Sequence, residues 1–207
     1  MRYVNKNAVA RFLSLWFKES MFNLPNLLTL FRLALLPLII LLLFIPASWA
    51  AAVALTLYVL GAVTDWLDGY VARKYNQVTE FGTFMDPISD KIYVVTIMLT
   101  LVATDRIAGI WVVLVLAILV REFLISGLRE YLGPKNIKVP VSDLAKWKTA
   151  AQMVATGLLI IAPYMFGGYV LGILALFGAT ALTLYTAWDY MKAGWAHMKS
   201  DLESESE

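Results

Sequence analysis

The sequence contains no cysteine and a single histidine, and only 15% of its 207 residues are charged. Without cysteine, the chain can form neither a disulfide nor a thiolate metal site. Soluble domains carry about 25% charged residues, and a net charge of +2 is too small to favour nucleic acid as a partner. Because 60% of the residues are hydrophobic, the composition predicts a membrane protein.

Six apolar segments are each close to the length that crosses a bilayer as a helix, about 20 residues. We expect helices because backbone polar groups that face lipid must be satisfied within their own segment. The predicted fold class is therefore all-α, a polytopic membrane protein with six transmembrane helices. The predicted spans are Leu27–Ile45, Ser48–Arg73, Gly82–Thr104, Gly109–Leu132, Asp143–Met165 and Gly168–Met191.

The first 22 residues differ from the spans that follow them. Apolar residues recur there at helical spacing with basic residues among them, which favours an amphipathic helix in the membrane interface over a disordered basic arm. We therefore divide the chain into a juxtamembrane segment over residues 1–22, a membrane domain over 23–197 and an acidic tail over 198–207. A cleaved secretory signal is a poorer interpretation of the first span, because the apolar run is too long and Arg32 interrupts it.

The basic residues indicate an orientation. With six spans, both termini and the loops around residues 73–81 and 129–148 share one side of the membrane. Apart from Arg106, every lysine and arginine lies on that side or in the adjacent half of the membrane. The positive-inside rule then predicts an integral protein of the inner, cytoplasmic membrane with both termini in the cytoplasm.

Four aspartates lie where acidic residues are costly. Asp65 and Asp68 lie near the end of the second predicted span. Asp86 and Asp90 lie near the start of the third. An ionisable group inside a membrane is tolerated when it is paired or faces a polar cavity. Residues three or four apart share a helix face, and a short loop makes the two helices antiparallel neighbours, so the four carboxylates can converge at one depth near the cytosol.

Converging carboxylates repel one another unless cations are present. Lys91 and Arg73 are too few and too differently placed to neutralise all four. An oxygen-only ligand set suits hard divalent ions, of which Mg²⁺ is the usual choice in phosphate chemistry. Two such ions could clamp a pyrophosphate and stabilise a phosphoryl group during transfer. A purely structural carboxylate cluster, or the proton relay of a transporter, is the alternative.

The spacing of these residues matches a family signature. Residues 65–90 read D-x2-D-G-x2-A-R-x8-G-x3-D-x3-D, and every fixed position agrees with the signature of the CDP-alcohol phosphatidyltransferases. The resemblance extends over nearly the whole chain, because residues 23–32 are similar to the start of the first span in this family. Residues 121–129 and 146–152 resemble its phosphatidylglycerophosphate synthase branch, although Ala145 stands where that branch usually has glycine.

The resemblance implies roles for residues at the matching positions. Asp65, Asp68 and Asp86 would be the main ligands of Mg²⁺ or Mn²⁺, with two ions bound. Asp90 would be the general base on the acceptor hydroxyl and a further metal contact. The nucleotide and its pyrophosphate would be bound by Asn26, Thr29, Gly69, Ala72, Arg73 and Gly82. The resemblance also implies a homodimer.

The implied reaction transfers the phosphatidyl group of CDP-diacylglycerol to an alcohol with release of CMP. We expect direct displacement, because no covalent nucleophile is evident. Cationic groups near the cytoplasmic ends of the fourth and fifth spans would suit an anionic acceptor, and glycerol 3-phosphate is the expected one. The residues expected to bind its phosphate are Arg121, Arg129, Lys146 and Lys148.

Two alternatives remain for the function. The same enzyme class could use serine, an inositol phosphate or phosphatidylglycerol as the acceptor. Outside this class, a cation- or proton-coupled transporter could use the aspartates as its ion site. A transporter would more naturally place acidic residues near the membrane midplane and show repeat symmetry, whereas here the acidic residues lie near one side and no repeat is visible.

Overall fold

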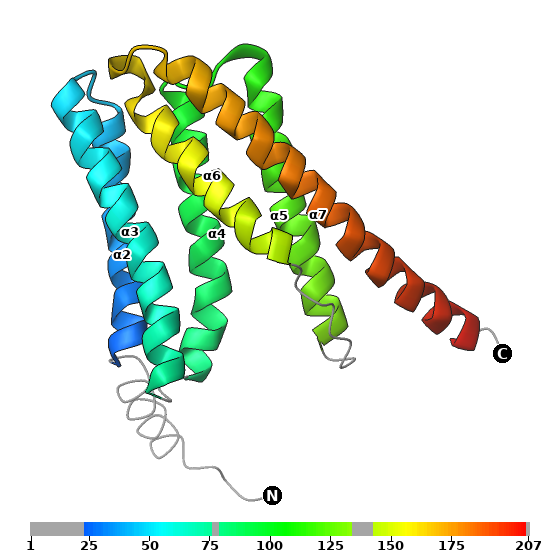
Figure 1. Cartoon of the computed structure of the whole chain (residues 1–207). Coiled ribbons are helices and arrows are strands. Elements are labelled where there is room, and N and C mark those ends of the chain that lie inside the picture. The colour runs from blue at the N-terminus through cyan, green and yellow to red at the C-terminus, as the bar shows by residue number, and fades with distance from the viewer. Residues whose placement is uncertain (1–22, 76–78, 134–142, 206–207) are drawn as a thin grey trace, which may run out of the picture. The chain divides into compact units, whose positions relative to one another are not determined.

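The computed structural model describes residues 23–75, 79–133 and 143–205, and of these it leaves out the side chains of 143–146, 189 and 193–205. The described residues form helices joined by short turns (Figure 1), which confirms the predicted all-α class. The α-helices are α2 (Leu24–Leu43), α3 (Ser48–Lys74), α4 (Glu80–Ala103), α5 (Val112–Leu132), α6 (Asp143–Ile161) and α7 (Gly168–Glu205). Two 3₁₀ turns, η1 (Gly109–Trp111) and η3 (Ala162–Tyr164), precede α5 and follow α6.

Four segments in the described part of the chain are long and apolar enough to cross a membrane. They are Leu24–Leu43, Ser48–Lys74, Gly109–Leu132 and Gly168–Lys192. The other two predicted spans correspond to α4 and α6, which carry charged residues in their first halves. The count of six spans therefore stays a prediction, and the proposed interfacial helix over residues 1–22 lies outside the described residues.

Helix α7 continues beyond the sixth predicted span. The prediction ends this span at Met191, and the candidate membrane span ends at Lys192, whereas the helix itself continues to Glu205. The part beyond Met191 contains no proline, and 8 of its 14 residues are lysine, alanine, methionine, leucine or glutamate, which are good helix formers. Much of the predicted tail is thus a helical extension of α7.

The chain divides into two compact units between Ile97 and Met98. In the first unit, α2 begins where the Asn23 side chain accepts a hydrogen bond from the backbone N–H of Asn26, with a proline in its first turn, and both features favour a helix start. Small side chains on α3, Ala50, Ala51 and Ala54, are fully buried, and such residues allow helices to approach closely. The start of α2, the end of α3 and the start of α4 lie at the same end of this unit (Figure 1).

Tyr93 attaches α4 to α3. Its hydroxyl donates a hydrogen bond of 2.9 Å to the backbone oxygen of Tyr58, and the two rings stack with centroids 5.8 Å apart. The ring of Tyr93 lies against Gly61, where a Cβ atom would approach its Cζ to 2.8 Å. Gly61 is therefore required for this contact, because any side chain there would displace the tyrosine.

The second unit is built from α5, α6 and α7. A Cβ atom at Gly172 of α7 would lie 2.7 Å from Cδ2 of Leu159 on α6, so these helices pack closely. Arg106, in the turn between α4 and η1, is 6% exposed and donates a hydrogen bond to the backbone oxygen of Ile160. That bond satisfies a carbonyl at the end of α6, where the helix itself offers no partner.

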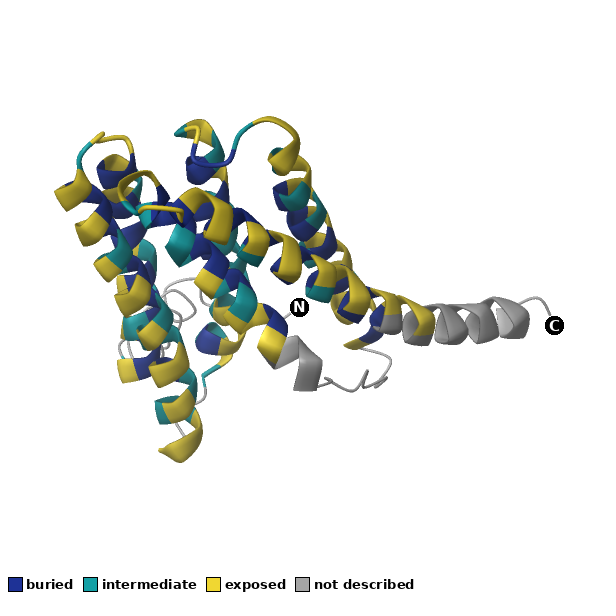
Figure 2. Ribbon diagram, turned by 45° about the horizontal axis from the view of Figure 1, so that its top comes forward, coloured by how far each residue is buried: buried dark blue, intermediate teal, exposed yellow. Residues whose placement is uncertain are grey.

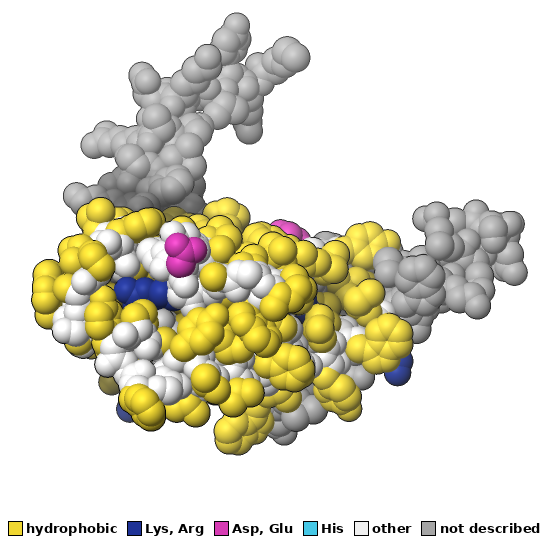
Figure 3. Space-filling model, turned by 90° about the horizontal axis from the view of Figure 1, so that it is seen from above, with side chains coloured by type: hydrophobic (Ala, Val, Ile, Leu, Met, Phe, Trp, Pro, Cys, Tyr) yellow, Lys and Arg dark blue, Asp and Glu magenta, His cyan; other side chains and the backbone are white. Residues whose placement is uncertain are grey.

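Hydrophobic side chains cover much of the molecular surface. Buried positions follow one side of each helix, and exposed positions follow the other (Figure 2). Figure 3 shows a face on which hydrophobic side chains predominate and charged ones are isolated. Exposed apolar surface on this scale marks an interaction with lipid or protein, in agreement with a membrane protein.

The contact between Gly61 and Tyr93 gives a test of packing. We expect Gly61→Leu to destabilise the protein by about 1–3 kcal/mol, because an overpacked side chain forces its neighbours to move. The matched control is Gly127→Leu in α5, where a Cβ atom would meet no heavy atom within 4 Å. Thermal unfolding in detergent should show a lower midpoint for the Gly61 variant alone; equal midpoints for the two variants would contradict the described packing.

Candidate active site

One face of α2 carries three polar residues that are almost fully buried. Asn26, Thr29 and Arg32 are spaced three residues apart and are 2%, 2% and 3% exposed. Residues at this spacing share a helix face. Polar groups buried in an apolar helix need partners on neighbouring helices, and these three find them on α3 and in the segment that begins α4.

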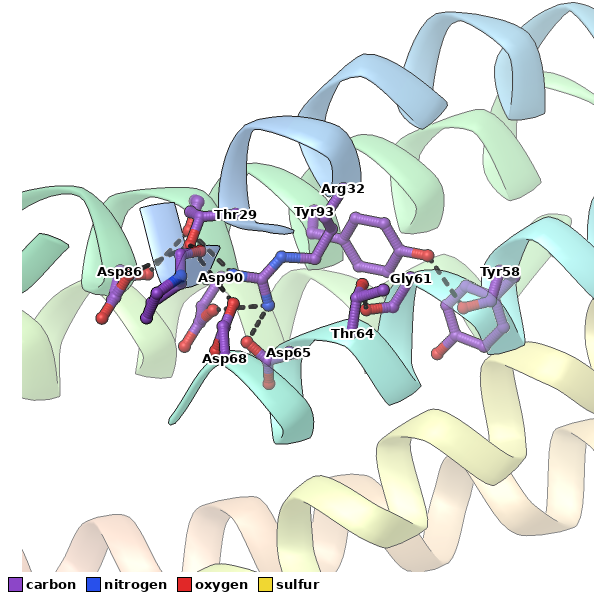
Figure 4. A network of polar contacts seen from close by, with 12 residues as sticks. Thr29, Arg32, Tyr58, Gly61, Thr64, Asp65, Asp68, Asp86, Asp90 and Tyr93 are labelled. Atoms are coloured by element: carbon purple, nitrogen blue, oxygen red, sulfur yellow. Dashed lines mark hydrogen bonds and ion pairs between the residues drawn. The ribbon is translucent and has the colours of Figure 1, made fainter. Parts of the chain in front are cut away.

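Arg32 of α2 bonds to side chains of both α3 and α4 (Figure 4). Its NH1 pairs with Oδ1 of Asp65 on α3 and, at 3.0 Å, with Oδ1 of Asp90 on α4. Its NH2 donates to Oγ of Ser89 at 3.0 Å. The Nε atom is buried without a hydrogen-bond partner in the described part of the chain. One guanidinium therefore joins a carboxylate of α3 to a carboxylate of α4.

Thr29 joins the other two aspartates. Its Oγ1 lies 3.2 Å from Oδ2 of Asp68 and 3.3 Å from Oδ1 of Asp86. The same hydroxyl lies 3.2 Å from the backbone oxygen of Pro25. A hydroxyl carries one hydrogen and can donate it to one acceptor at a time. The Thr29 hydroxyl therefore has three acceptor oxygens around it and one proton to donate.

The four carboxylates form an acidic site, which we define as Asp65, Asp68, Asp86 and Asp90. Arg32 pairs with both Asp65 and Asp90, and its one positive charge is smaller than the four formal negative charges of the site. Carboxylates that converge in this way repel one another unless cations are present. The all-oxygen donor set fits hard divalent cations. Among the described residues, no group of three or more acidic or histidine side chains is close enough to hold one metal ion. Arg32 instead contacts Asp65 and Asp90, and Thr29 contacts Asp68 and Asp86, so each of them joins one carboxylate of α3 to one of α4.

Arg32 is the residue of this site that the sequence prediction does not include. Lys91 and Arg73 were considered as counter-ions because they adjoin the aspartates in sequence, but Arg73 is exposed at the end of α3. In the sequence, Arg32 interrupts the first apolar run and ends the segment over residues 23–32 that resembles the family, and neither feature assigns it to the aspartates. A buried cation in a span needs a partner at its own depth just as a buried acid does, and that rule would have paired Arg32 with the aspartates.

The segment before α4 brings Gly82 against Asn26. The Thr79 hydroxyl accepts a hydrogen bond of 3.0 Å from the backbone N–H of Gly82, a typical helix cap. The Asn26 amide donates to the same Thr79 oxygen at 3.1 Å. A Cβ atom at Gly82 would lie 2.7 Å from Oδ1 of Asn26, so only glycine permits this approach of α4 to α2.

The remaining residues expected at the nucleotide lie on the last turns of α3. Gly69 and Ala72 are half-buried and Arg73 is exposed. A Cβ atom at Gly69 would be 3.6 Å from NH2 of Arg73, so the arginine side chain folds back along its own helix. Of the residues expected at the nucleotide, the structure thus brings Thr29 to the acidic site, and it places Asn26 and Gly82 against each other near the starts of α2 and α4.

A second polar cluster lies within the second unit. Arg121 of α5 and Lys148 of α6 both contact Oε1 of Glu122, at 3.2 Å and 2.5 Å. Arg129 instead donates to the Tyr190 hydroxyl at 2.9 Å and lies 5.1 Å from the centre of its ring. The structure therefore brings together two of the residues expected to bind the acceptor. The side chain of a further one, Lys146, lies outside the described residues.

The chain is similar to known proteins over most of its length. The family model of the CDP-alcohol phosphatidyltransferases matches residues 22–186. A CDP-diacylglycerol–glycerol-3-phosphate 3-phosphatidyltransferase of Rickettsia typhi is 45% identical over 174 residues, which make up 83% of this chain and 96% of that protein. Proteins of the same name from Shigella flexneri and Escherichia coli are each 41% identical over 180 residues, or 86% of this chain and 97% of theirs.

The matched range contains the acidic site, Arg32 and the cluster around Glu122, so the likeness extends to both polar regions of the structure. The family expected from the spacing of residues 65–90 is thereby confirmed: this chain belongs to the CDP-alcohol phosphatidyltransferase family.

Proposed function

We propose that this chain transfers the phosphatidyl group of CDP-diacylglycerol to the primary hydroxyl of glycerol 3-phosphate, releasing phosphatidylglycerophosphate and CMP. The observation that carries the proposal is the acidic site, where four carboxylates of α3 and α4 gather around Arg32 and Thr29 with more negative charge than Arg32 balances. The names of the relatives, which cover most of the chain, support the same donor and acceptor.

The membrane provides the setting for this reaction. All six long helices would span the bilayer, with residues 1–22 as an interfacial helix and both termini in the cytoplasm. The acidic site would then lie near the cytoplasmic surface, where the headgroup of CDP-diacylglycerol can reach it while the acyl chains stay in the bilayer. A homodimer, as the family resemblance implies, belongs to the same proposal.

The acidic site is suited to divalent cations. Asp65, Asp68, Asp86 and Asp90 would hold two ions of Mg²⁺ or Mn²⁺, and the surplus of acceptors around Thr29 fits this assignment. When bound, such ions would neutralise the pyrophosphate and polarise the phosphorus atom under attack. The nucleotide would lie against Asn26, Thr29, Gly69, Ala72, Arg73 and Gly82.

The chain's own residues account for the proton and the geometry. Asp90 would take the proton of the acceptor hydroxyl while the hydroxyl oxygen forms a bond to phosphorus. The bond between phosphorus and the CMP oxygen would break at the same time, and its electron pair would leave with CMP. The Asp90 side chain is 54% exposed, so an acceptor can approach it. Before ligands bind, its contact with Arg32 holds it on the side of α4 that faces α2.

The acceptor phosphate would be bound by Arg121, Arg129, Lys146 and Lys148. Guanidinium groups bind phosphate with two parallel hydrogen bonds, and the Arg121 and Lys148 side chains are less than a tenth exposed. Cations in so apolar a setting favour an anionic alcohol over a neutral one. This distinction separates glycerol 3-phosphate from serine.

The choice of acceptor is tested by one assay. We expect purified protein with Mg²⁺ or Mn²⁺ and CDP-diacylglycerol to release CMP when glycerol 3-phosphate is added, and to lose this activity in a chelator. Serine, an inositol phosphate and phosphatidylglycerol are offered in parallel. Release with one of these alone would assign another acceptor, while metal flux into vesicles without any CMP would favour a transporter.

The role of Asp90 is tested by Asp90→Asn. Removing a general base lowers a rate by about 10²–10⁴-fold, and we expect a loss of kcat in this range. Binding of CDP-diacylglycerol in the presence of Mg²⁺, measured by calorimetry, should remain close to that of the wild type. Full activity of the variant would exclude Asp90 as the base.

The balance between Arg32 and the acidic site is tested by Arg32→Gln. Removing one partner of a buried ion pair costs about 3–5 kcal/mol, so the midpoint of thermal unfolding should fall in metal-free buffer. Mg²⁺ should restore part of this loss and stabilise the variant more than the wild type, because a ligand that binds the folded state adds to its stability.

The matched control for this experiment is Lys74→Gln, which removes one positive charge from an exposed site at the end of the same α3 helix that carries Asp65. Its unfolding midpoint should respond to Mg²⁺ as the wild type does. An equal response in Arg32→Gln and Lys74→Gln would show that Arg32 and the cations do not share the carboxylates.

A further inference from the structure

Glu122 lies between two buried cations of the second unit. Its Oε1 is 3.2 Å from NH1 of Arg121 and 2.5 Å from Nζ of Lys148, so one carboxylate oxygen bridges α5 and α6. The side chains of Arg121 and Lys148 are 7% and 9% exposed, whereas that of Glu122 is 22% exposed. The acid is therefore the member of the cluster that can most easily turn toward water.

Arg121 is held in place independently of Glu122. Its Nε donates to the backbone oxygen of Thr183 at 3.2 Å, and its NH2 donates to Oγ1 of Thr186 at 3.0 Å. Gln152 of α6 donates to the Thr183 hydroxyl at 3.0 Å, which ties α6 to the same turn of α7. These bonds fix the guanidinium and leave NH1 as the donor directed at Glu122.

The charges of this cluster are better matched to a phosphate than to a carboxylate. Arg121 and Lys148 carry two positive charges, and Glu122 supplies one negative charge in contact with both. A phosphate monoester carries about two negative charges near neutral pH and three acceptor oxygens. It could take over both contacts of Glu122 and neutralise both cations.

We propose that the Glu122 carboxylate occupies the place of the acceptor's phosphate in the ligand-free protein and is displaced when the acceptor binds; this rests on the proposed function. The exchange favours anionic acceptors. A neutral alcohol that pushed Glu122 aside would leave two buried cations without a counter-charge, and an uncompensated buried charge is strongly unfavourable. Glu122 thus acts as a specificity-determining residue as well as a structural ion-pair partner.

The test uses Glu122→Gln in the full chain, which keeps the size of the side chain and removes its charge. The matched control is Glu130→Gln, an exposed glutamate on the same helix. Three quantities are measured: the KM for glycerol 3-phosphate, the inhibition constant of inorganic phosphate as a competitor of the acceptor, and the shift of the unfolding midpoint when inorganic phosphate is added without substrates.

For Glu122→Gln we expect the KM and the inhibition constant each to fall by about threefold or more, because the competing charge is gone. The unfolding midpoint should fall without ligand and rise more than that of the wild type when phosphate is added. Glu130→Gln should match the wild type in all three measurements. Glu122→Asp, whose shorter side chain reaches the two cations less well, should lie between wild type and Glu122→Gln.

The contrary outcomes are distinct. If the wild type uses glycerol 3-phosphate but Glu122→Gln shows an unchanged or raised KM and an unchanged or raised inhibition constant, Glu122 does not compete with phosphate and the inference fails while the proposed function stands. If the wild type releases CMP only with a neutral alcohol, and phosphate neither inhibits nor stabilises it, the proposed acceptor is wrong and the inference falls with it.

Discussion

A guanidinium buried in an apolar helix dictates much of the first unit. Arg32 is 3% exposed, and the surrounding hydrophobic side chains cannot satisfy it, so carboxylates of neighbouring helices must do so. This requirement sets which faces of α3 and α4 turn toward α2, because Asp65 and Asp90 must both reach NH1. Thr29, one turn earlier on α2, repeats the pattern with Asp68 and Asp86.

The acidic site and the cluster around Glu122 have opposite majority charges. The acidic site holds four carboxylates and one guanidinium, whereas the cluster in the second unit holds Arg121 and Lys148 around the single acid Glu122. Each cluster contains one residue of the charge opposite to its majority. On the proposed assignment, Arg32 carries the same sign as the metal ions and Glu122 the same sign as the acceptor phosphate. In the ligand-free protein, Arg32 would therefore partly balance the aspartates that bind the metal ions, and Glu122 would partly balance the cations that bind the phosphate.

The helices could be predicted from the sequence because hydrophobic length, glycine and proline are local signals. The predicted second span, Ser48–Arg73, differs from α3 by one residue at its end. The pairing of Arg32 with Asp65 could not be predicted from local signals, since the two residues are 33 positions apart in the sequence. Helix periodicity gives the helix face on which a residue lies, but it does not give the neighbouring helix that this face contacts. Counter-ions were sought next to the aspartates in sequence, and the structure supplies one from another helix.

Resident counter-charges also bear on turnover. A ligand that enters a site already neutralised by Arg32 or Glu122 exchanges one ion pair for another, so the net gain on binding is smaller than the strength of the new contacts. Tight binding of substrate or product in the ground state does not raise kcat, because only interactions that strengthen in the transition state do so. Exchange of this kind would keep ground-state binding weak while leaving the fully charged, preorganised groups available to the phosphoryl group in transfer. The ion pairs that allow these charges to be buried would thus also favour release of the products.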